Sequence, residues 1–262
     1  MFESEYLNLA DRLVQTGSKR IGRNGGTRSL PFETLEFDLS GGEFPLLTSR
    51  RINYQGALGE YAAMIRGPQH VSDFHEWNCN FWNRNADADT GNLTLDYGNA
   101  WRDYNGVNQM ESVLDSLKHR PYDRRMLITG WRPDRLNDLS LPCCHYGYQF
   151  YVDNEDYVHL LWQQRSADIM LGVPNDAVVA AVMLLCFADL CGRKPGRVKM
   201  MLGDAHIYES HIENFLQQRE AECTLPPSYM FGKQTDLYSF EPQDLIILKY
   251  RPNPIIKYKL AV

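Results

Sequence analysis

Apolar residues recur along the chain at spacings and lengths that predict several helices. The amphipathic N-terminal segment predicts a helix over 5–16. Helical length predicts a second over 54–65, and a third is expected over 107–118, before the turn at Pro121. The second ends at Arg66-Gly67-Pro68, which is a strong helix stop. The longest apolar run predicts a buried central helix over 177–191 that ends near Gly192.

Other runs are rich in β-branched and aromatic residues, bounded by turn residues, and predict strands. Between the first helix and the strands, the segment SKRIGRNGGTRS at 18–29 is basic and glycine-rich and predicts a mobile loop. Helices and strands together predict an α+β fold, and without repeats or linker-like runs residues 1–262 are expected to form a single domain. The predicted strands are MLITGW at 126, YQFYV at 148, YVHLLW at 157, VKMML at 198 and LIILKY at 245.

The composition fits a globular protein in a reducing compartment. The chain has 262 residues, of which 44% are hydrophobic and 23% charged, which argues against disorder. Its six cysteines follow no regular spacing, and a chain of this size does not need disulfide staples. A cytosolic protein is therefore expected.

Neither export nor membrane insertion is predicted. The N-terminal segment MFESEYLNLADRL is acidic and amphipathic, and it lacks the basic and apolar regions of a secretory signal. The longest apolar run reaches residue 190 only by including Asp189, which leaves it short of the ~20 residues that span a bilayer.

The net charge of −6 gives no general attraction to nucleic acid, so any phosphate would have to be bound by a local group of arginines. Guanidinium groups bind phosphate oxygens bidentately, which makes a small anion the favoured ligand. The alternative for each arginine taken singly is a solvated surface ion pair. The candidates are Arg23, Arg124, Arg125 and Arg165.

Two adjacent cysteines in LPCCHYGYQFYV precede a predicted strand. Such a position holds a side chain rigidly at a cleft, so Cys143 or Cys144 is a candidate nucleophile. The alternative is an inert buried hydrophobe, the commoner setting for cysteine. No metal is expected, because His206 and His211 are five positions apart rather than four and CCH has no partner pair elsewhere.

Several short strings, in the same order and spacing, resemble thymidylate synthase along nearly the whole chain. One string alone would be weak evidence, but QRSAD-x-x-LG-x-P together with LPCCH and GDAHIY is highly specific. The strings are RNGGT at 23, FPLLTSRR at 44, YGNAWR at 97, DRR at 123, LPCCH at 141, QRSADIMLGVP at 164, GDAHIY at 203 and KYKLAV at the C-terminus.

The resemblance implies a fold and a nucleotide site. The fold would be α/β (α+β), a large mixed β-sheet flanked by helices, in a homodimer whose sheets pack against each other. Arg23 and Arg165 would hold the phosphate from one subunit, and Arg124 with Arg125 would reach over from the other. Further substrate contacts would come from Gln164, Ser166, His206 and Tyr208, the last two at the sugar 3'-hydroxyl.

The resemblance also implies a reaction. Cys144 would attack C6 of the pyrimidine, since it directly precedes His145 as the family motif requires, and Cys143 stands where proline is usual. Addition at C6 makes C5 nucleophilic toward the one-carbon unit of 5,10-methylenetetrahydrofolate, while Glu60 would move protons through ordered water. The other positions implied in catalysis or at the folate site are Tyr97, His145, Asp168, Trp82, Leu141, Leu171, Gly172, Asn175 and Ala261.

The chain departs from thymidylate synthase after GVP, where Asn175-Asp176 replaces Phe-Asn. The family asparagine reads uracil by accepting from N3–H and donating to O4. Cytosine reverses this pattern and suits Asp176, which would accept from the 4-amino group when ionised or donate to N3 when protonated. The same pair resembles bacteriophage deoxycytidylate hydroxymethylases, which would work in the host cytoplasm. The retained Ser166 and Arg124-Arg125 favour dCMP over CMP.

The reaction at C5 could finish in two ways. Addition of water to the one-carbon unit would give a hydroxymethyl group, and addition of a hydride from the folate would give a methyl group. Asn85 and Asn175 replace family aromatic residues and favour water. Trp82, His145 and the complete KYKLAV terminus are typical of a hydride-transferring site. We expect a dCMP 5-hydroxymethylase, with a dCMP 5-methyltransferase that yields dihydrofolate as the alternative.

Other readings are weaker. A thymidylate synthase acting on dUMP or a CMP hydroxymethylase would fit the base or sugar contacts less well. A catalytically silent nucleotide- or RNA-binding relative is the least favoured, because it could lose Cys144, Glu60 or Asp168 without affecting its fold, and all are present.

Overall fold

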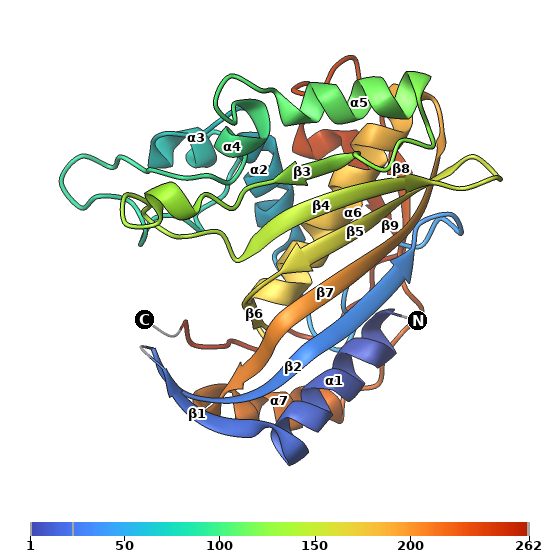
Figure 1. The fold of residues 1–262 in the computed structure, drawn as a ribbon. Helices are drawn as coiled ribbons and strands as arrows, with labels where there is room; N and C mark the ends of the chain where they lie inside the picture. The colour runs from blue at the N-terminus through green and yellow to red at the C-terminus, as the bar shows by residue number, and fades with distance from the viewer. Residues whose placement is uncertain (1, 23, 261–262) are drawn as a thin grey trace.

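A computed structural model describes residues 2–22 and 24–260, and its main feature is a large mixed β-sheet (Figure 1). Its strands are β1 (Ser18–Gly22), β2 (Gly25–Asp38), β3 (Leu127–Thr129), β4 (His145–Val152), β5 (Tyr157–Gln164), β6 (Ala167–Asp168) and β7 (Lys194–Tyr208). They lie in the order β1-β2-β7-β5-β4-β3, with β6 beside β7. Neighbours are antiparallel except β5 and β6, which run parallel to β7.

Helices cover one side of this sheet and its lower end, and Figure 1 shows α2 and α6 behind the strands. A small second sheet pairs β8 (Ser228–Phe231) with β9 (Leu245–Leu248). The helices are α1 (Phe2–Thr16), α2 (Tyr54–Met64), α3 (Val71–His75), α4 (Asn99–Arg102), α5 (Gln109–His119), α6 (Gly172–Cys191) and α7 (Ile212–Arg219).

Helix α6 forms the centre of the core. Its side chains are buried from Val173 to Ala188 except at Asn175 and Asp176, which are half-buried. Among the described helices it is the one that is long and apolar enough to cross a bilayer, but 78% of its apolar window is buried inside the protein, as in a core helix. The polar interruption at 175–176 therefore marks where this helix faces a site.

The opposite side of the sheet is open. Along β7, Val198, Met200 and Leu202 are fully buried toward α6, whereas the alternating Lys199 and Met201 are exposed. Tyr151 on β4 is also 65% exposed. A sheet normally buries at least one face, and apolar side chains on the second face suit packing against another surface.

Most predicted elements are confirmed, with shifted ends. Helices predicted over 5–16, 54–65 and 107–118 correspond to α1, α2 and α5. The central helix begins at Gly172, five residues before the predicted start, because Asn175 and Asp176 interrupt the apolar run that predicts it. The predicted strands correspond to β3, β4, β5, β7 and β9.

The prediction of a mobile loop over 18–29 is wrong. Residues 18–22 form β1 and residues 25–29 begin β2, and the two strands pair antiparallel. Gly25 has a φ of +113°, a conformation that glycine adopts readily and that the tight turn uses. Arg28 pairs with Glu209 at 3.0 Å. The basic and glycine-rich composition therefore reflects ion pairing and a turn rather than an unstructured segment.

Candidate active site

Cys144 lies directly before β4, where its backbone is held from two sides. Its N–H donates to the phenol oxygen of Tyr97, and its carbonyl accepts from the Arg165 amide at 2.8 Å. Cys144 is half-buried, whereas Cys143 is only 1% exposed. Of the two thiols, Cys144 is thus the one open to a ligand.

Burial outweighs the nearby positive charge at the Cys144 thiol, so its pKa is raised above the ordinary value. Burial raises its pKa, the Arg165 guanidinium lowers it, and the Asp176 carboxylate raises it again. Burial raises the pKa of Cys143 much further, and Asp96 adds to that shift. Additional positive charge beside Cys144 would be needed to populate the thiolate that a nucleophilic cysteine requires.

Arg165 binds the backbone of the loop that leads to Cys144. Its Nε donates to the Cys143 carbonyl at 2.7 Å, and its Nη2 donates to the Pro142 carbonyl at 2.9 Å. The guanidinium carbon lies 5.4 Å from the centre of the Trp131 ring. Because Arg165 remains exposed beyond these contacts, it can also meet an anion beside the thiol.

Glu60 projects from α2 toward the same region. Its Oε1 accepts a hydrogen bond from Trp82 Nε1 at 2.8 Å, and the Trp82 ring packs against Tyr97 with centroids 5.4 Å apart. Burial raises the pKa of Glu60 to about 8, and the Asp176 carboxylate adds to that shift. A carboxyl group poised near neutral pH can both give and take a proton, as a general acid-base requires.

A chain of hydrogen bonds orients Asp176 on α6. Trp162 Nε1 donates to Gln164 Oε1 at 3.1 Å, and Gln164 Nε2 lies 2.7 Å from Asp176 Oδ2. Because an indole N–H can only donate, it fixes the amide oxygen on its own side and the amide nitrogen toward Asp176. Asp176 Oδ2 is therefore an acceptor, and a proton on this carboxyl group resides on Oδ1.

Burial raises the pKa of Asp176 to about 7; the Gln164 hydrogen bond opposes the shift and Asp168 adds to it. A Cβ on Gly172 would lie 3.5 Å from Asp176 Oδ2 and 3.8 Å from Asp168 Cβ, which shows how closely these three residues gather. Two carboxyl groups, Glu60 and Asp176, thus titrate near neutral pH in one site. Clustered, strongly shifted groups of this kind are a signature of functional sites.

His145 is buried between aromatic rings and is neutral. Its ring centroid lies 4.6 Å from that of Tyr97 and 4.3 Å from that of Trp162, and its Nδ1 is 2.6 Å from the Tyr148 hydroxyl. Burial lowers its pKa to about 3. Its Nε2 lies 3.9 Å from Asp176 Oδ1, but a neutral imidazole at that distance forms no ion pair.

The parallel pairing of β6 with β7 brings Asp168 opposite His206. The His206 and Tyr208 rings meet edge to face with centroids 5.5 Å apart. Asp168 Oδ1 accepts from the amides of Met170 (2.9 Å) and Leu171 (3.3 Å), which fixes the start of α6. Ser166 is half-buried in the turn between β5 and β6, and its carbonyl accepts from Gln164.

Asn175 carries an unusual buried atom. Its Nδ2 donates to the Leu171 carbonyl at 3.0 Å, but its Oδ1 is buried and has no hydrogen-bond partner among the described residues. A buried acceptor without a donor is costly, so this oxygen suits a water or ligand donor. Leu141, Leu171 and Gly172 are half-buried beside the core.

Some predicted site residues are not brought together within this chain. Arg124 and Arg125 are exposed in the turn before β3, where Arg125 Nε pairs with Asp123 at 2.9 Å and a pocket of about 660 Å³ opens beside them. Their predicted roles belong to a partner's site. Arg23 and Ala261 lie outside the described residues.

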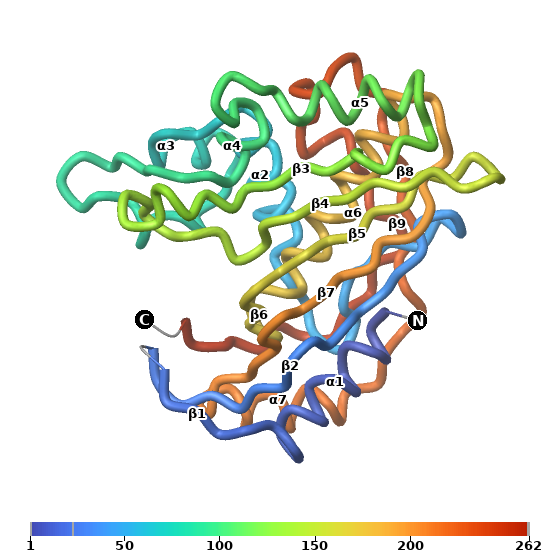
Figure 2. The backbone as a smooth tube through the Cα atoms, in the orientation of Figure 1, coloured from blue at the N-terminus to red at the C-terminus, as the bar shows by residue number. Residues whose placement is uncertain are grey.

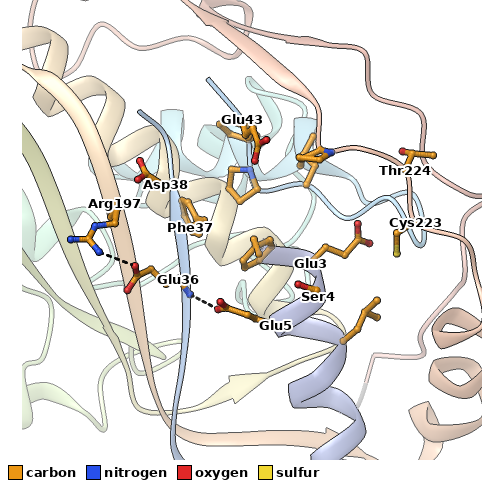
Figure 3. A pocket seen from close by; sticks show the side chains of 16 residues that line it. Glu3, Ser4, Glu5, Glu36, Phe37, Asp38, Glu43, Arg197, Cys223 and Thr224 are labelled. Carbon is orange, nitrogen blue, oxygen red and sulfur yellow. Dashed lines mark hydrogen bonds and ion pairs between the residues drawn. The ribbon is translucent and has the colours of Figure 1, made fainter. Parts of the chain in front are cut away.

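A separate pocket of about 410 Å³ lies between the start of α1 and the end of β2 (Figure 3). None of the predicted site residues lines it. Its carboxylates repel phosphate, since they include Glu3, Glu5, Glu36, Asp38 and Glu43 against the one cation Arg197. In the described ranges, no group of three or more histidine, cysteine, aspartate or glutamate side chains could hold a metal ion.

Sequence patterns did not reveal the supporting residues Trp162 and Tyr148. Both are fully buried aromatic residues of predicted strands, and this pattern is shared with ordinary core positions. The spacing of Trp162 and Gln164 on one face of β5 was a usable signal, because alternate strand residues point the same way.

The raised pKa of Glu60 predicts a pH-dependent stability. The folded-state pKa of about 8 exceeds the ordinary 4.5, so the unfolded chain binds fewer protons between these values and stability falls as pH rises through them. Glu60→Gln stays neutral at every pH. Its Tm should equal that of the wild type at pH 4 and lie on the order of 5 °C above it at pH 8.5. Calorimetric melts at both pH values test this; a Tm difference independent of pH contradicts it.

Comparison with known proteins assigns the chain to a class. The model of the thymidylate synthase family matches residues 4–262. The bifunctional dihydrofolate reductase-thymidylate synthase of Leishmania amazonensis is 32% identical over 287 residues, covering 99% of this chain and 55% of that protein. The chain thus spans about half the length of this curated relative.

The fold and the match together place the chain in one family. The chain belongs to the thymidylate synthase family. This membership confirms the resemblance seen in the sequence and the expected α/β fold with a large mixed sheet.

Proposed function

We propose that the chain is a dCMP 5-hydroxymethylase that uses 5,10-methylenetetrahydrofolate and water. The observation that carries this proposal is the orientation of Asp176: Gln164 donates to Oδ2, so the carboxyl group offers the base a proton or a lone pair on Oδ1. With the pKa of Asp176 raised to about 7, the protonated form is populated at neutral pH. Cytosine N3 is an acceptor, whereas uracil N3 carries a hydrogen, so this arrangement favours cytosine.

In the proposed first step, the proton of Asp176 neutralises the negative charge that develops on N3. Cys144 Sγ forms a bond to C6, the C5=C6 pair shifts to C4–C5, and the C4=N3 pair moves to N3, which takes the proton from Asp176 Oδ1. The product of this step is a neutral enamine that is nucleophilic at C5. Glu60, with a pKa near 8, would later remove the C5 proton.

Three residues of the proposed site suit a folate. Trp82 offers an aromatic wall, Asp168 a carboxylate, and the buried Asn175 Oδ1 an acceptor that lacks a donor. The cofactor would supply a one-carbon unit at the oxidation level of formaldehyde. Its transfer with water gives 5-hydroxymethyl-dCMP and tetrahydrofolate, and no reductant is consumed. A water held by Asn175 Oδ1 would supply the hydroxyl group.

A dCMP 5-methyltransferase is the second candidate. The hydrogen bond from Trp82 Nε1 to Glu60 and the ring contact with Tyr97 keep an aromatic wall at the site. Such packing would exclude water and favour hydride transfer from the folate, which would then leave as dihydrofolate. The two candidate reactions share every step before the final addition of water or hydride to the one-carbon unit.

The phosphate site is proposed to be completed by a second copy. Arg165 is exposed beside Cys144, and burial keeps the thiol pKa high within one chain. Arg124 and Arg125 are exposed, and the open face of β4 and β7, where Tyr151 and Met201 are exposed beside Lys199, suits the packing of two sheets. Arginines from the partner would bind the phosphate and lower the thiol pKa.

Product analysis tests the proposal. Incubation with dCMP labelled with tritium at C5 and 5,10-methylenetetrahydrofolate should release the label and yield a nucleotide about 30 Da heavier than dCMP, with no absorbance change from dihydrofolate. A gain of about 14 Da with dihydrofolate formation would favour the methyltransferase instead. Retained tritium would contradict both and point to a nucleotide-binding protein.

A further inference from the structure

His145 lies between the carboxyl group of Asp176 and a buried phenol. It begins β4, which runs beside β5, and Figure 2 shows both strands in front of α6, the helix that carries Asp176. Its Nε2 is 3.9 Å from Asp176 Oδ1, and its Nδ1 is 2.6 Å from the Tyr148 hydroxyl. Because the buried ring is neutral, one of these nitrogens carries a hydrogen and the other a lone pair. The tautomer of His145 therefore decides what faces Asp176.

The Tyr148 hydroxyl indicates which tautomer is present. It lies 3.1 Å from the backbone carbonyl of His145, which can only accept, so the single hydroxyl hydrogen goes to that carbonyl. The phenol oxygen then offers Nδ1 only lone pairs, and Nδ1 must donate the hydrogen bond of 2.6 Å. His145 thus carries its hydrogen on Nδ1 and a lone pair on Nε2.

Trp101 supports this arrangement. Its ring meets that of Tyr148 edge to face, with centroids 5.0 Å apart. Burial raises the pKa of Tyr148, and the Trp101 indole opposes that shift, as a donor near the phenol oxygen does. Trp101 Nε1 is itself buried and has no regular hydrogen bond within the described ranges. Since an indole nitrogen can only donate, it adds a second donor near the oxygen that accepts from His145.

This tautomer turns the lone pair of His145 Nε2 toward Asp176 Oδ1. A lone pair repels an ionised carboxylate and attracts a hydrogen on Oδ1. At 3.9 Å the contact acts through space or through one bridging water. The opposite tautomer would place an N–H group at Oδ1 and favour the carboxylate instead.

The remaining groups that interact with Asp176 do not reverse this preference. Gln164 on β5 favours the ionised form, but its amide donates to Oδ2 and leaves Oδ1 to His145. Negative charge on Asp176 is also disfavoured by the acidic groups nearest to it, which are Asp168 on β6, Glu60 on α2 and the thiol of Cys144 before β4.

We propose that Tyr148 is a positioning residue that fixes the Nδ1–H tautomer of His145 and so keeps a proton on Asp176 Oδ1 for cytosine N3. This inference deepens the proposed function and rests on it. When Asp176 has given its proton to N3, the Nε2 lone pair disfavours the carboxylate that results. The proton therefore returns to Oδ1 when the thiolate leaves C6 and the aromatic ring is restored.

Nitrogen NMR with isotope-labelled histidine reads the tautomer directly and needs no nucleotide. The signals of His145, assigned by their absence from His145→Asn, should show a protonated Nδ1 and a bare Nε2 at neutral pH. In Tyr148→Phe the Nδ1 hydrogen loses its acceptor, so the hydrogen should move to Nε2. A protonated Nε2 in the wild-type protein would overturn the proposal, and this measurement alone decides if Tyr148→Phe does not fold.

The pH profile of kcat/KM for dCMP measures the consequence, since it reports groups of the free enzyme. Wild-type activity should fall at alkaline pH as Asp176 loses its proton. In Tyr148→Phe an N–H group at Oδ1 would stabilise the carboxylate, so this limb should lie about one pH unit lower, with activity above it reduced about tenfold. Glu60 is common to both proteins, so the difference between the profiles reports Asp176.

Tyr61→Phe is the matched control, because it removes another fully buried tyrosine hydroxyl, one that lies beside Cys186 on α6 rather than beside His145. Its pH profile should coincide with that of the wild type. A Tyr148→Phe profile that overlays the wild type, or that is lowered equally at every pH, contradicts the role of Tyr148 and leaves the proposed function standing. If wild-type protein releases no tritium from labelled dCMP, the proposed function is wrong, and the inference about Tyr148 falls with it.

Discussion

Replacing Cys144 by serine should lower kcat for dCMP by at least about 10⁴-fold, because a serine hydroxyl without an adjacent base is a far weaker nucleophile than a thiolate. Cys143→Ser, by contrast, should keep most of the activity. Cys143 is 1% exposed and its carbonyl, rather than its thiol, takes part in the contact with Arg165. Single-turnover assays with both variants measure the difference.

Stability must be separated from chemistry in this comparison. Serine at the buried position 143 places a hydroxyl group among apolar neighbours, so some loss of Tm is expected there and little at the half-buried position 144. Assays at a temperature where both variants are folded remove that effect. Equal loss of turnover from the two variants would contradict the choice of Cys144 as nucleophile.

Asp176→Asn should reverse the choice of base. The Gln164 amide would still donate to the oxygen at position 176, which turns the new amide nitrogen toward the base as a donor. That nitrogen can donate to O4 of uracil, but it can neither accept from the 4-amino group of cytosine nor transfer a proton to N3 as the Asp176 carboxyl group would. A site discriminates strongly against a substrate that leaves its buried polar groups unpaired. The ratio of kcat/KM for dCMP to kcat/KM for dUMP should therefore fall by about 10³-fold or more.

The shape of residue 176 hardly changes in this substitution, so the fold should be kept. Removing a buried carboxyl group with a raised pKa should even raise the Tm above pH 7. A matched control is Asp168→Asn, which should lower activity toward both nucleotides without changing their ratio. An unchanged ratio in Asp176→Asn would mean that the base is read elsewhere.

Local patterns predicted the regular core well and the sheet edge poorly. The apolar run of α6 and the amphipathic pattern of α1 carry their structure in their own sequence. The start of β2 does not, because its strand is polar, passes Pro31 and turns through Phe32 at a φ of +57° with that ring 85% exposed. Its pairing with β7 supplies what local propensity does not.

The same distinction applies to the site. The motifs identified Cys144, Glu60 and Asp176 as candidates, since each has a recognisable neighbourhood in the sequence. The hydrogen bond from Gln164 to Asp176 and the contact of His211 with Lys259 join positions 12 and 48 residues apart. Such contacts follow from how β5 packs on α6 and how the C-terminus lies on α7, which no local pattern encodes.

The indole of Trp162 has an evolutionary consequence. It locks the Gln164 amide in one orientation, so this donor is presented whether an acid or an amide stands at position 176. The codons for aspartate and asparagine differ in one base. A lineage with this scaffold could therefore exchange one pyrimidine substrate for the other by a single point mutation, without an intermediate in which the neighbouring amide is left facing the wrong way.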